Sequence, residues 1–376
     1  MTSRAATIAD LVPAALHLLN PNRAAPSVLS PQASAGDVDQ VIIWLIDGFG
    51  YDQLTTALEQ GLMPHLKQQL QGGLAHVDAI QTVNPSMTPV ALASLLTGSE
   101  PSRHGIVGQV IYCENAAVDV LRGPLPDNLR LATPEIGELA DEAGVTYDAV
   151  LQNNILRGPL TSLLHQRPEA IRTYIRESGI AAVLNDVLIK RRRGIVYLYT
   201  SGIDAINHSR GAYQMEWRAE VESLDRTIAQ MQAPNEFKSW LWITADHGHV
   251  PMKGVILYSD LKARLPEIAD HPAQIGTAIA IDAPDRDALH QALADIAPVP
   301  VDIVPLNDLV SSGYFGATDL GVFRARLGEY VLRPAPGWGW AESPGDAHLW
   351  SHGGISPQEM TVPWVQMPLP IGRSAS

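Results

Sequence analysis

The stretch Val41-Ile42-Ile43-Trp44-Leu45-Ile46-Asp47-Gly48-Phe49-Gly50 decides the fold, because an unbroken apolar run ends there in a carboxylate followed by glycine. A run this short, bulky and rich in β-branched residues is typical of a strand buried on both faces, and so of a parallel sheet flanked by helices. Asp47 would then lie at the carboxyl end of the strand, where open α/β sheets bind ligands. Gly48 would let the backbone turn sharply. The alternative is that Asp47 only caps a following helix.

Two more apolar runs, at 194–200 and 240–245, have the same character, and each is followed within a few residues by a carboxylate. Shorter strands are predicted over 76–81 and 147–151, and helices over 8–19, 52–71, 134–142, 171–188 and 215–231. A loop is predicted over 201–211. Strands alternating with helices at this spacing predict an α/β fold with a doubly wound, mainly parallel sheet and helices on both faces.

The pattern changes after residue 254. We expect a strand over 277–283, a helix over 285–296, strands over 301–304 and 330–332, and a loop over 334–340. This order predicts a small α+β cap, residues 255–342, inserted into a core made of residues 1–254 and 343–376. A last strand over 360–365 would return to the core.

Composition limits the classes of function. The chain has 376 residues, 46% hydrophobic and 18% charged, with a formal charge of −14, which argues against binding to nucleic-acid polymers. The basic run 190–193 is interpreted as a solvated helix end. The single cysteine, Cys113, excludes an internal disulfide framework and a cysteine-rich zinc site. Any metal must therefore be held by histidines and carboxylates.

The sequence predicts no membrane span, because no apolar run is long enough. Charged and helix-breaking residues interrupt residues 8–19, which resemble an amphipathic helix more than a secretion signal. We therefore expect a cytoplasmic protein, although Ala33-Ser34-Ala35 keeps a cleaved signal open. Nothing in the sequence indicates the oligomeric state.

The three carboxylates at the predicted strand ends are Asp47, Asp204 and Asp246. In a parallel sheet these ends meet at one edge, where like charges repel and raise each other's pKa unless a cation lies between them. The natural resolution is a metal ion.

Histidines accompany these carboxylates. His247 adjoins Asp246, His208 follows Asp204 by four residues, and His352 stands in a glycine-flanked turn. A separation of four puts Asp204 and His208 on one face if the segment is helical. Nitrogen and oxygen donors suit zinc first and manganese next, and six ligands are enough for two ions. His104 and His249 are interpreted as structural histidines, with orientation of a ligand as the alternative.

Thr88 is the predicted nucleophile. It directly precedes Pro89 and an apolar helical segment, so its hydroxyl would lie at a helix N-terminus, which attracts anions. A hydroxyl becomes a strong nucleophile when a metal lowers its pKa. Ser86 is the competing hydroxyl.

These motifs together resemble the type I phosphodiesterase/nucleotide pyrophosphatase branch of the alkaline phosphatase superfamily. The resemblance rests on the following segments in this order: Leu45-Ile46-Asp47-Gly48, Asn84-Pro85-Ser86-Met87-Thr88-Pro89, Gly105-Ile106-Val107-Gly108, Asp204-x3-His208, Asp246-His247-Gly248 and His352-Gly353-Gly354. Each motif alone is weak, but the ordered set is specific.

The resemblance implies an alkaline phosphatase-like core and two divalent ions, most simply zinc. One zinc would be held by Asp204, His208 and His352. The second would be held by Asp47, Asp246 and His247, with Thr88 as both ligand and nucleophile. Where the family has an asparagine that binds a phosphate oxygen, this sequence has Gln109.

The function that follows is metal-dependent hydrolysis of a small-molecule phosphodiester or nucleotide pyrophosphate through a phospho-threonine. Pro89, Val90 and Ala91 follow Thr88, so the arginine that monoesterases place there is missing. A phosphomonoesterase or a phosphonate hydrolase remains an alternative, as does a catalytically silent module that binds metal or a phosphorylated ligand. Trp338 and Trp340 could stack on a base or an aromatic leaving group, although tryptophans in a loop rich in proline and glycine more often pack the cap.

Overall fold

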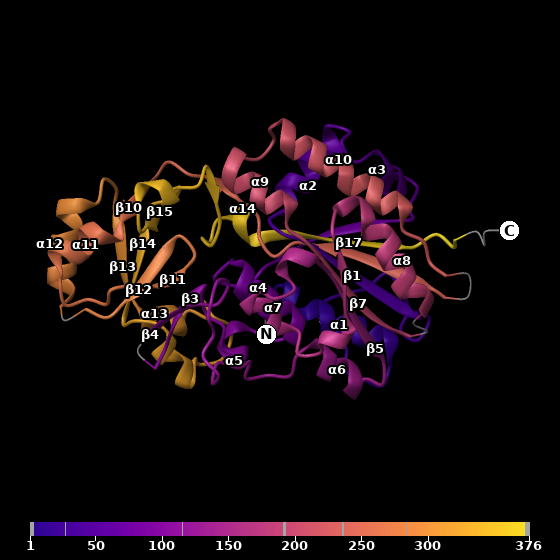
Figure 1. The fold of residues 1–376 in the computed structure, drawn as a ribbon, viewed down its shortest axis with the longest axis horizontal. Coiled ribbons are helices and arrows are strands. Elements are labelled where there is room, and N and C mark those ends of the chain that lie inside the picture. Colours follow the sequence, from indigo (N-terminus) through magenta and orange to yellow (C-terminus); the bar gives the residue numbers. More distant parts are fainter. Residues whose placement is uncertain are drawn as a thin grey trace.

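The computed structural model describes residues 4–26, 28–114, 116–190, 193–234, 237–283 and 285–372. Figure 1 shows a large α/β lobe and a smaller lobe beside it. Arg191 and Arg192 of the predicted basic run lie outside the described residues. Among the described residues, no helix has both the length and the hydropathy needed to cross a bilayer.

The large lobe is built on a sheet of seven strands. In spatial order they are β2 (His76–Gln81), β17 (Thr361–Pro368), β8 (Ser239–Thr244), β1 (Gln40–Ile46), β7 (Gly194–Thr200), β5 (Thr146–Gln152) and β6 (Ile171–Tyr174). Every residue of β1 is buried, and β1 pairs in parallel with β7 and β8. Only β17 runs antiparallel to its neighbours in this sheet. The predicted mainly parallel sheet is confirmed.

Helices cover both faces of this sheet (Figure 1). On one face lie α2 (Tyr51–Glu59), α3 (Pro64–Gln71), α8 (Ile180–Lys190), α9 (Gly202–Arg210) and α10 (Met215–Gln230). On the other lie α1 (Leu11–Leu19), α4 (Thr88–Thr97), α6 (Ile136–Glu142) and α7 (Pro159–Leu164), with α5 (Pro101–His104) following α4. The short helix α14 (Pro357–Met360) leads into β17. The 3-10 turns are η1 (Ile8–Asp10), η2 (Asn153–Ile155), η3 (Pro168–Ala170), η4 (Glu177–Gly179), η5 (Gly321–Arg326) and η6 (Pro344–Asp346).

Four local predictions differ from the structure. The helix predicted over 52–71 is two helices, because Gly61 adopts a left-handed φ of 71° and Pro64 starts a new helix. The first residues of the helix predicted over 171–188 form strand β6, which pairs with β5. The loop predicted over 201–211 is helix α9. The loop predicted over 334–340 ends in strand β15, which pairs with β10.

The smaller lobe has a sheet of six strands. Their order is β13 (Val301–Pro305), β14 (Tyr330–Pro334), β12 (Ala278–Ile281), β11 (Ala273–Ile275), β3 (Val110–Cys113) and β4 (Ala116–Asp119). The other elements are α11 (Tyr258–Arg264), α12 (Arg286–Ile296), α13 (Leu306–Ser311) and the pair β10 (Gly254–Leu257) and β15 (Trp338–Ala341). A separate hydrophobic core, drawn from residues between Ile256 and Trp340, holds this lobe together. We still propose that residues 255–342 form the cap. Strands β3 and β4, which come earlier in the chain, extend its sheet.

Candidate metal centre

The carboxyl ends of three adjacent strands bring the predicted carboxylates together. Asp47 follows β1, Asp246 follows β8, and Asp204 lies in the first turn of α9, directly after β7. Gly48 turns with a φ of 71°, and its N–H donates to Oδ1 of Asp246 over 3.0 Å. Asp47 and Asp246 are buried, so the sheet delivers two carboxylates into a space with little water.

One cluster gathers around Asp204. Its Oδ1 lies 3.3 Å from Nε2 of His208, 3.1 Å from Nε2 of His249 and 3.9 Å from Nε2 of His352. The ligand atoms of these four residues all lie within 4.8 Å of one another. Ligands bound tetrahedrally to zinc at about 2.0 Å are separated by about 3.3 Å, so these spacings suit one shared ion.

The second cluster contains Asp47, Asp246 and His247. Nε2 of His247 lies 3.2 Å from Oδ2 of Asp246 and 3.5 Å from Oδ1 of Asp47. Oγ1 of Thr88 lies 3.3 Å from the same nitrogen. The Tyr199 hydroxyl donates to Oδ2 of Asp47 and leaves Oδ1 facing the cluster. The structure therefore brings Thr88 together with this cluster.

Backbone carbonyls orient three of the imidazoles. Nδ1 of His208 lies 2.8 Å from the Trp350 carbonyl, Nδ1 of His352 lies 3.0 Å from the Ser86 carbonyl, and Nδ1 of His247 lies 3.2 Å from the Gly248 carbonyl. A carbonyl only accepts, so each Nδ1 carries the proton and each Nε2 presents a lone pair. These lone pairs face carboxylate oxygens, and a cation held between them would make such an arrangement favourable.

Unpartnered buried atoms support the same conclusion. Oδ1 of Asp47, Oδ1 of Asp204 and Oδ2 of Asp246 lie near imidazoles but accept no hydrogen bond within the described part of the chain. Burial, followed by the charges of Asp246 and Asp204, raises the pKa of Asp47 well above its ordinary value. Burial and the charge of Asp204 raise the pKa of Asp246 to about 7. These residues fit two metal ions, which would supply the missing positive charge.

Thr88 and Ser86 have different surroundings. Thr88 is the first residue of α4, where its hydroxyl faces His247. The Ser86 hydroxyl donates to the Gly354 carbonyl over 2.8 Å, so it holds the loop that carries His352. The geometry therefore favours Thr88 as the hydroxyl beside the metal ligands.

Apart from His249, the other residues considered from the sequence are not ligands in either cluster. The side chain of Gln109 donates to Oδ2 of Asp119 over 3.4 Å, and no contact in the described residues joins it to Thr88. His104 is buried and bonded to Ser94 Oγ at 2.8 Å, with its pKa lowered to about 3 by burial and the charge of Arg326. It is a structural histidine. Trp340 packs in the core of the smaller lobe, whereas Trp338 lines a cavity.

His249 was interpreted from the sequence as a structural histidine, but it joins the Asp204 cluster. Its Nδ1 lies 3.2 Å from the Gly48 carbonyl and 3.3 Å from the Asn207 side-chain nitrogen. The signal available in the sequence was the segment Asp246-His247-Gly248-His249, which places two imidazoles directly after one strand. Tyr199 was also missed, because a tyrosine inside an apolar strand resembles any other core residue.

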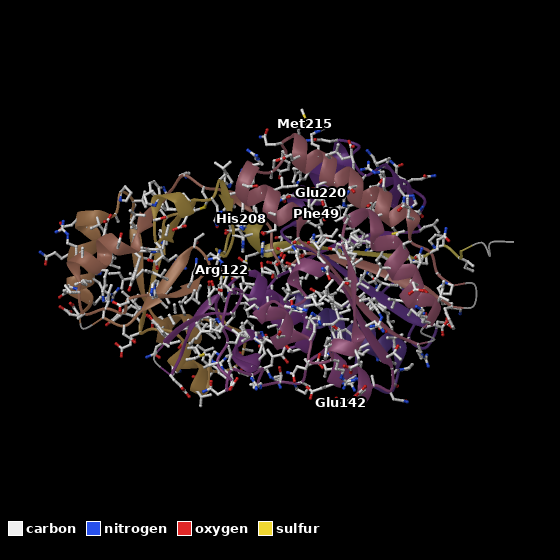
Figure 2. The ribbon with its side chains drawn as sticks, viewed as in Figure 1. Phe49, Arg122, Glu142, His208, Met215 and Glu220 are labelled. Atoms are coloured by element: carbon white, nitrogen blue, oxygen red, sulfur yellow. The ribbon has the colours of Figure 1, made fainter. Side chains whose placement is uncertain are left out.

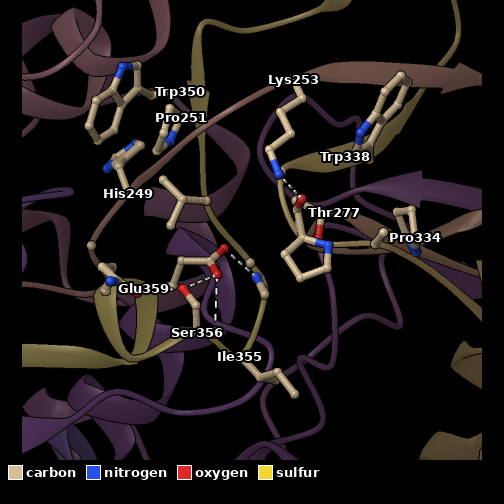
Figure 3. A pocket seen from close by; sticks show the side chains of 18 of the residues that line it. His249, Pro251, Lys253, Thr277, Pro334, Trp338, Trp350, Ile355, Ser356 and Glu359 are labelled. Carbon is tan, nitrogen blue, oxygen red and sulfur yellow. Dashed lines mark hydrogen bonds between the residues drawn. The ribbon is translucent and has the colours of Figure 1, made fainter. Parts of the chain in front are cut away.

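Two cavities flank the centre. One of about 800 Å³ lies where the lobes meet; Figure 3 shows His249 and Trp350 at one side of it and Trp338 and Lys253 at another. The other, of about 270 Å³, is lined by Thr88 itself. The first is larger, but the second reaches Thr88, the predicted nucleophile.

Comparison with solved structures shows the same fold. Phosphonoacetate hydrolase from Sinorhizobium meliloti 1021, in complex with phosphonoformate, is 21% identical with a TM-score of 0.67, covering 90% of this chain and 92% of that one. Murine ectonucleotide pyrophosphatase/phosphodiesterase 5, as an inactive variant in complex with AMP, is 17% identical with a TM-score of 0.67, covering 87% of each chain. The human protein of that name is also 17% identical, with a TM-score of 0.64 and coverage of 86% and 87%.

No curated protein matches the sequence. The family model of the type I phosphodiesterases/nucleotide pyrophosphatases matches residues 41–355, which include most of the large lobe, the smaller lobe and every ligand of the two clusters. The chain therefore belongs to the type I phosphodiesterase/nucleotide pyrophosphatase family, a hydrolase branch of the alkaline phosphatase superfamily.

Proposed function

We propose that this enzyme hydrolyses a small-molecule phosphodiester or nucleotide pyrophosphate with Thr88 as the nucleophile. The observation that carries the proposal is the Thr88 hydroxyl, 3.3 Å from His247, beside two clusters of carboxylates and imidazoles. Two divalent ions, zinc first and manganese next, would lower the pKa of the nucleophile and stabilise charge on the attacking and leaving oxygens.

The residues divide into two ligand sets. Asp47, Asp246, His247 and Thr88 would hold one ion, while Asp204, His208 and His352 would hold the other, with His249 orienting Asp204. Oγ1 of Thr88 forms a bond to phosphorus as the bond to the leaving oxygen breaks on the Asp204 side. Water then hydrolyses the phospho-threonine and restores the hydroxyl. Gln109 remains a candidate for contact with a phosphate oxygen.

The cavity beside Thr88 supports an ester with an apolar or aromatic substituent. Its wall contains no lysine, arginine or carboxylate, and six of its side chains are aliphatic: Leu92, Leu121, Leu151, Ile155, Leu160 and Leu164. The Tyr197 hydroxyl in this wall is buried and has no hydrogen-bond partner among the described residues, so it can bind a polar atom of the substituent. The only substituent of a monoester is its leaving group, which departs on the Asp204 side. A monoester would therefore leave this wall of the cavity unfilled.

Phosphonate hydrolysis is the second candidate. It is favoured by the likeness to phosphonoacetate hydrolase, whose structure holds phosphonoformate. Binding of nucleic-acid polymers is not expected for a chain with a formal charge of −14. Cytoplasmic localisation remains a prediction from the sequence.

Turnover of bis(p-nitrophenyl) phosphate and p-nitrophenyl phosphate by zinc-loaded protein tests the proposal. We expect the diester to be preferred, and Thr88→Ala to lower kcat by about 10³-fold or more while the zinc content stays the same. Thr97→Ala, at the other end of the same helix, is the matched control. Turnover retained in Thr88→Ala but lost in Ser86→Ala would move the nucleophile to Ser86. No turnover of either substrate at any metal loading would contradict the proposal.

A further inference from the structure

We propose that the β11–β12 hairpin of the smaller lobe holds two parts of the metal centre in place, and that Gly276 at its tip is a positioning residue for the ion bound by His352. This inference rests on the proposed function, because it concerns ligands of the proposed ions. It goes further by giving the smaller lobe a part in metal binding, apart from any contact with substrate.

The tip of the hairpin is a tight turn that requires glycine. Strand β11 ends at Ile275 and β12 begins at Ala278, so the turn has only two residues. The first of them, Gly276, has a φ of 82°, which glycine adopts without strain. Within the sheet, β11 also pairs with β3, and β12 also pairs with β14. Pairing on both sides therefore makes the hairpin the firm partner in any contact that its tip makes.

The tip touches the loop that carries His352. A Cβ added to Gly276 would lie 2.5 Å from the carbonyl carbon of Gly353 and 2.6 Å from its Cα. A Cβ added to Gly353 would in turn meet the Cα of Gly276. The two backbones are thus in direct contact, with no room for a side chain between them. Gly353 directly follows His352, whose Nε2 lies 3.9 Å from Oδ1 of Asp204. The hairpin therefore packs against the neighbour of a proposed ligand.

The same tip touches the segment that carries the nucleophile. The Gly276 N–H donates to Sδ of Met87 over 2.7 Å. Met87 is buried and is the N-cap residue of α4, which begins with Thr88. The preceding residue, Ser86, accepts a hydrogen bond over 3.0 Å from Nδ1 of His352 through its carbonyl. One turn of the smaller lobe therefore contacts both the segment before Thr88 and the loop after His352.

The loop around His352 is the part that would move if this contact were opened. Residues 352–356, all of them described, belong to no helix or strand. The hairpin, by contrast, is paired on both sides in a lobe that has its own hydrophobic core. Figure 1 shows β11 on the side of the smaller lobe nearer the large one, and Figure 2 shows the ligand His208 close to where the lobes meet. Forcing tip and loop apart would therefore displace the His352 imidazole from its ion.

Gly276→Ala tests the inference through metal affinity, with Gly313→Ala as the matched control. Gly313, which follows α13, has a φ of 78°, and the nearest atom to its added Cβ is 3.6 Å away. Both variants carry the same left-handed strain, but only Gly276→Ala must open a contact, by about 1 Å. In competition with a chromophoric chelator, Gly276→Ala should weaken about 10-fold or more the zinc ion that His352→Ala removes. Gly313→Ala should keep both zinc affinities within about 2-fold of wild type.

Loading with Co²⁺ adds a readout that a general loss of stability would not change. The visible absorption of Co²⁺ depends on the arrangement of its ligands. We expect Gly276→Ala to alter the spectrum of the ion that His352→Ala removes, and Gly313→Ala to leave that spectrum unchanged.

Hydrogen exchange of the wild-type protein tests the same coupling without a substitution. If the hairpin contact favours the bound ion, the ion must favour the hairpin contact by the same factor. Zinc should therefore slow amide exchange in a peptide that covers residues 273–281 by about 10-fold, and leave exchange in α12 of the same lobe unchanged. This measurement decides the question if Gly276→Ala does not fold.

Two results would overturn the inference: equal zinc affinities in Gly276→Ala and Gly313→Ala, or hairpin exchange that zinc does not slow. In either case the smaller lobe would rest against the centre without positioning it, and the proposed function would stand. A wild-type protein that binds no zinc at all would instead contradict the proposed function, and this inference with it.

Discussion

Replacing Gly48 with alanine tests whether the turn after β1 shapes the metal centre. Gly48 adopts a φ of 71°, and a Cβ added there would lie 3.0 Å from Nδ1 of His249 and closer still to its Cε1. It would also lie 3.2 Å from the Cα of Asp204. The His249 ring is buried beneath this turn, so it cannot swing into solvent.

The size of the effect follows from these contacts. Carbon atoms pack at about 3.5 Å or more, so the ring must move by roughly 1 Å. Nε2 of His249 is only 3.1 Å from Oδ1 of Asp204, so this movement disturbs a carboxylate that we propose as a ligand. Losing such an orienting contact typically lowers metal affinity about 10- to 100-fold. The left-handed backbone costs a further ~1 kcal/mol in folding.

Gly61→Ala separates the two contributions. Gly61 has the same φ of 71°, but nothing lies within 4 Å of its added Cβ. Zinc affinity, measured by competition with a chromophoric chelator, should fall in Gly48→Ala and stay at the wild-type value in Gly61→Ala, while both lose stability in urea. If the two variants bind zinc within about 2-fold of each other, the His249 ring does not position Asp204, and this reasoning is refuted.

Two further predictions concern carboxylates, one buried and one half-buried. Asp47→Ala should lower zinc content and turnover together with little loss of fold, by elemental analysis and circular dichroism; unfolding without prior zinc loss would restore the helix-cap interpretation. Glu177 flanks Gly202 together with Glu220, and burial and Glu220 raise its pKa from 4.5 to about 8. The folded state therefore keeps this proton longer than the unfolded state, so the free energy of unfolding falls as pH rises from 4.5 to 8. Glu177→Gln should match wild type at pH 5 and be more stable by about 2 kcal/mol at pH 9, after allowing for solvent screening. Urea unfolding measures this, with the exposed Glu222→Gln as control; equal pH profiles for Glu177→Gln and wild type would contradict it.

The parts of the fold predicted best were those with strong local patterns. The apolar run of β1 and its two parallel neighbours identified the sheet, and the carboxylates after them met at one edge as expected. Thr88 was placed beside its cluster because a proline and an apolar segment marked the start of α4.

The parts predicted less well depend on contacts between distant segments. Helix α9 begins without a side-chain cap at Ser201, so its start is not fixed by local capping. Strand β3 joins the smaller lobe through the pairing of Val110 with Gln274, which no local pattern reveals. His249 reaches its cluster because Gly48 leaves room for the ring, and that space is a property of two segments together.

The position of β17 has a consequence for synthesis of the protein. This strand lies between β2 and β8 and pairs with both, yet it is made after every other strand of the sheet. Until residues 361–368 leave the ribosome, one edge of β8 is unpaired and β2 has no partner strand. Such edges invite pairing with other chains. A nascent chain that lacks β17 should therefore depend on chaperones. Once β17 has been released from the ribosome, the core should fold without them.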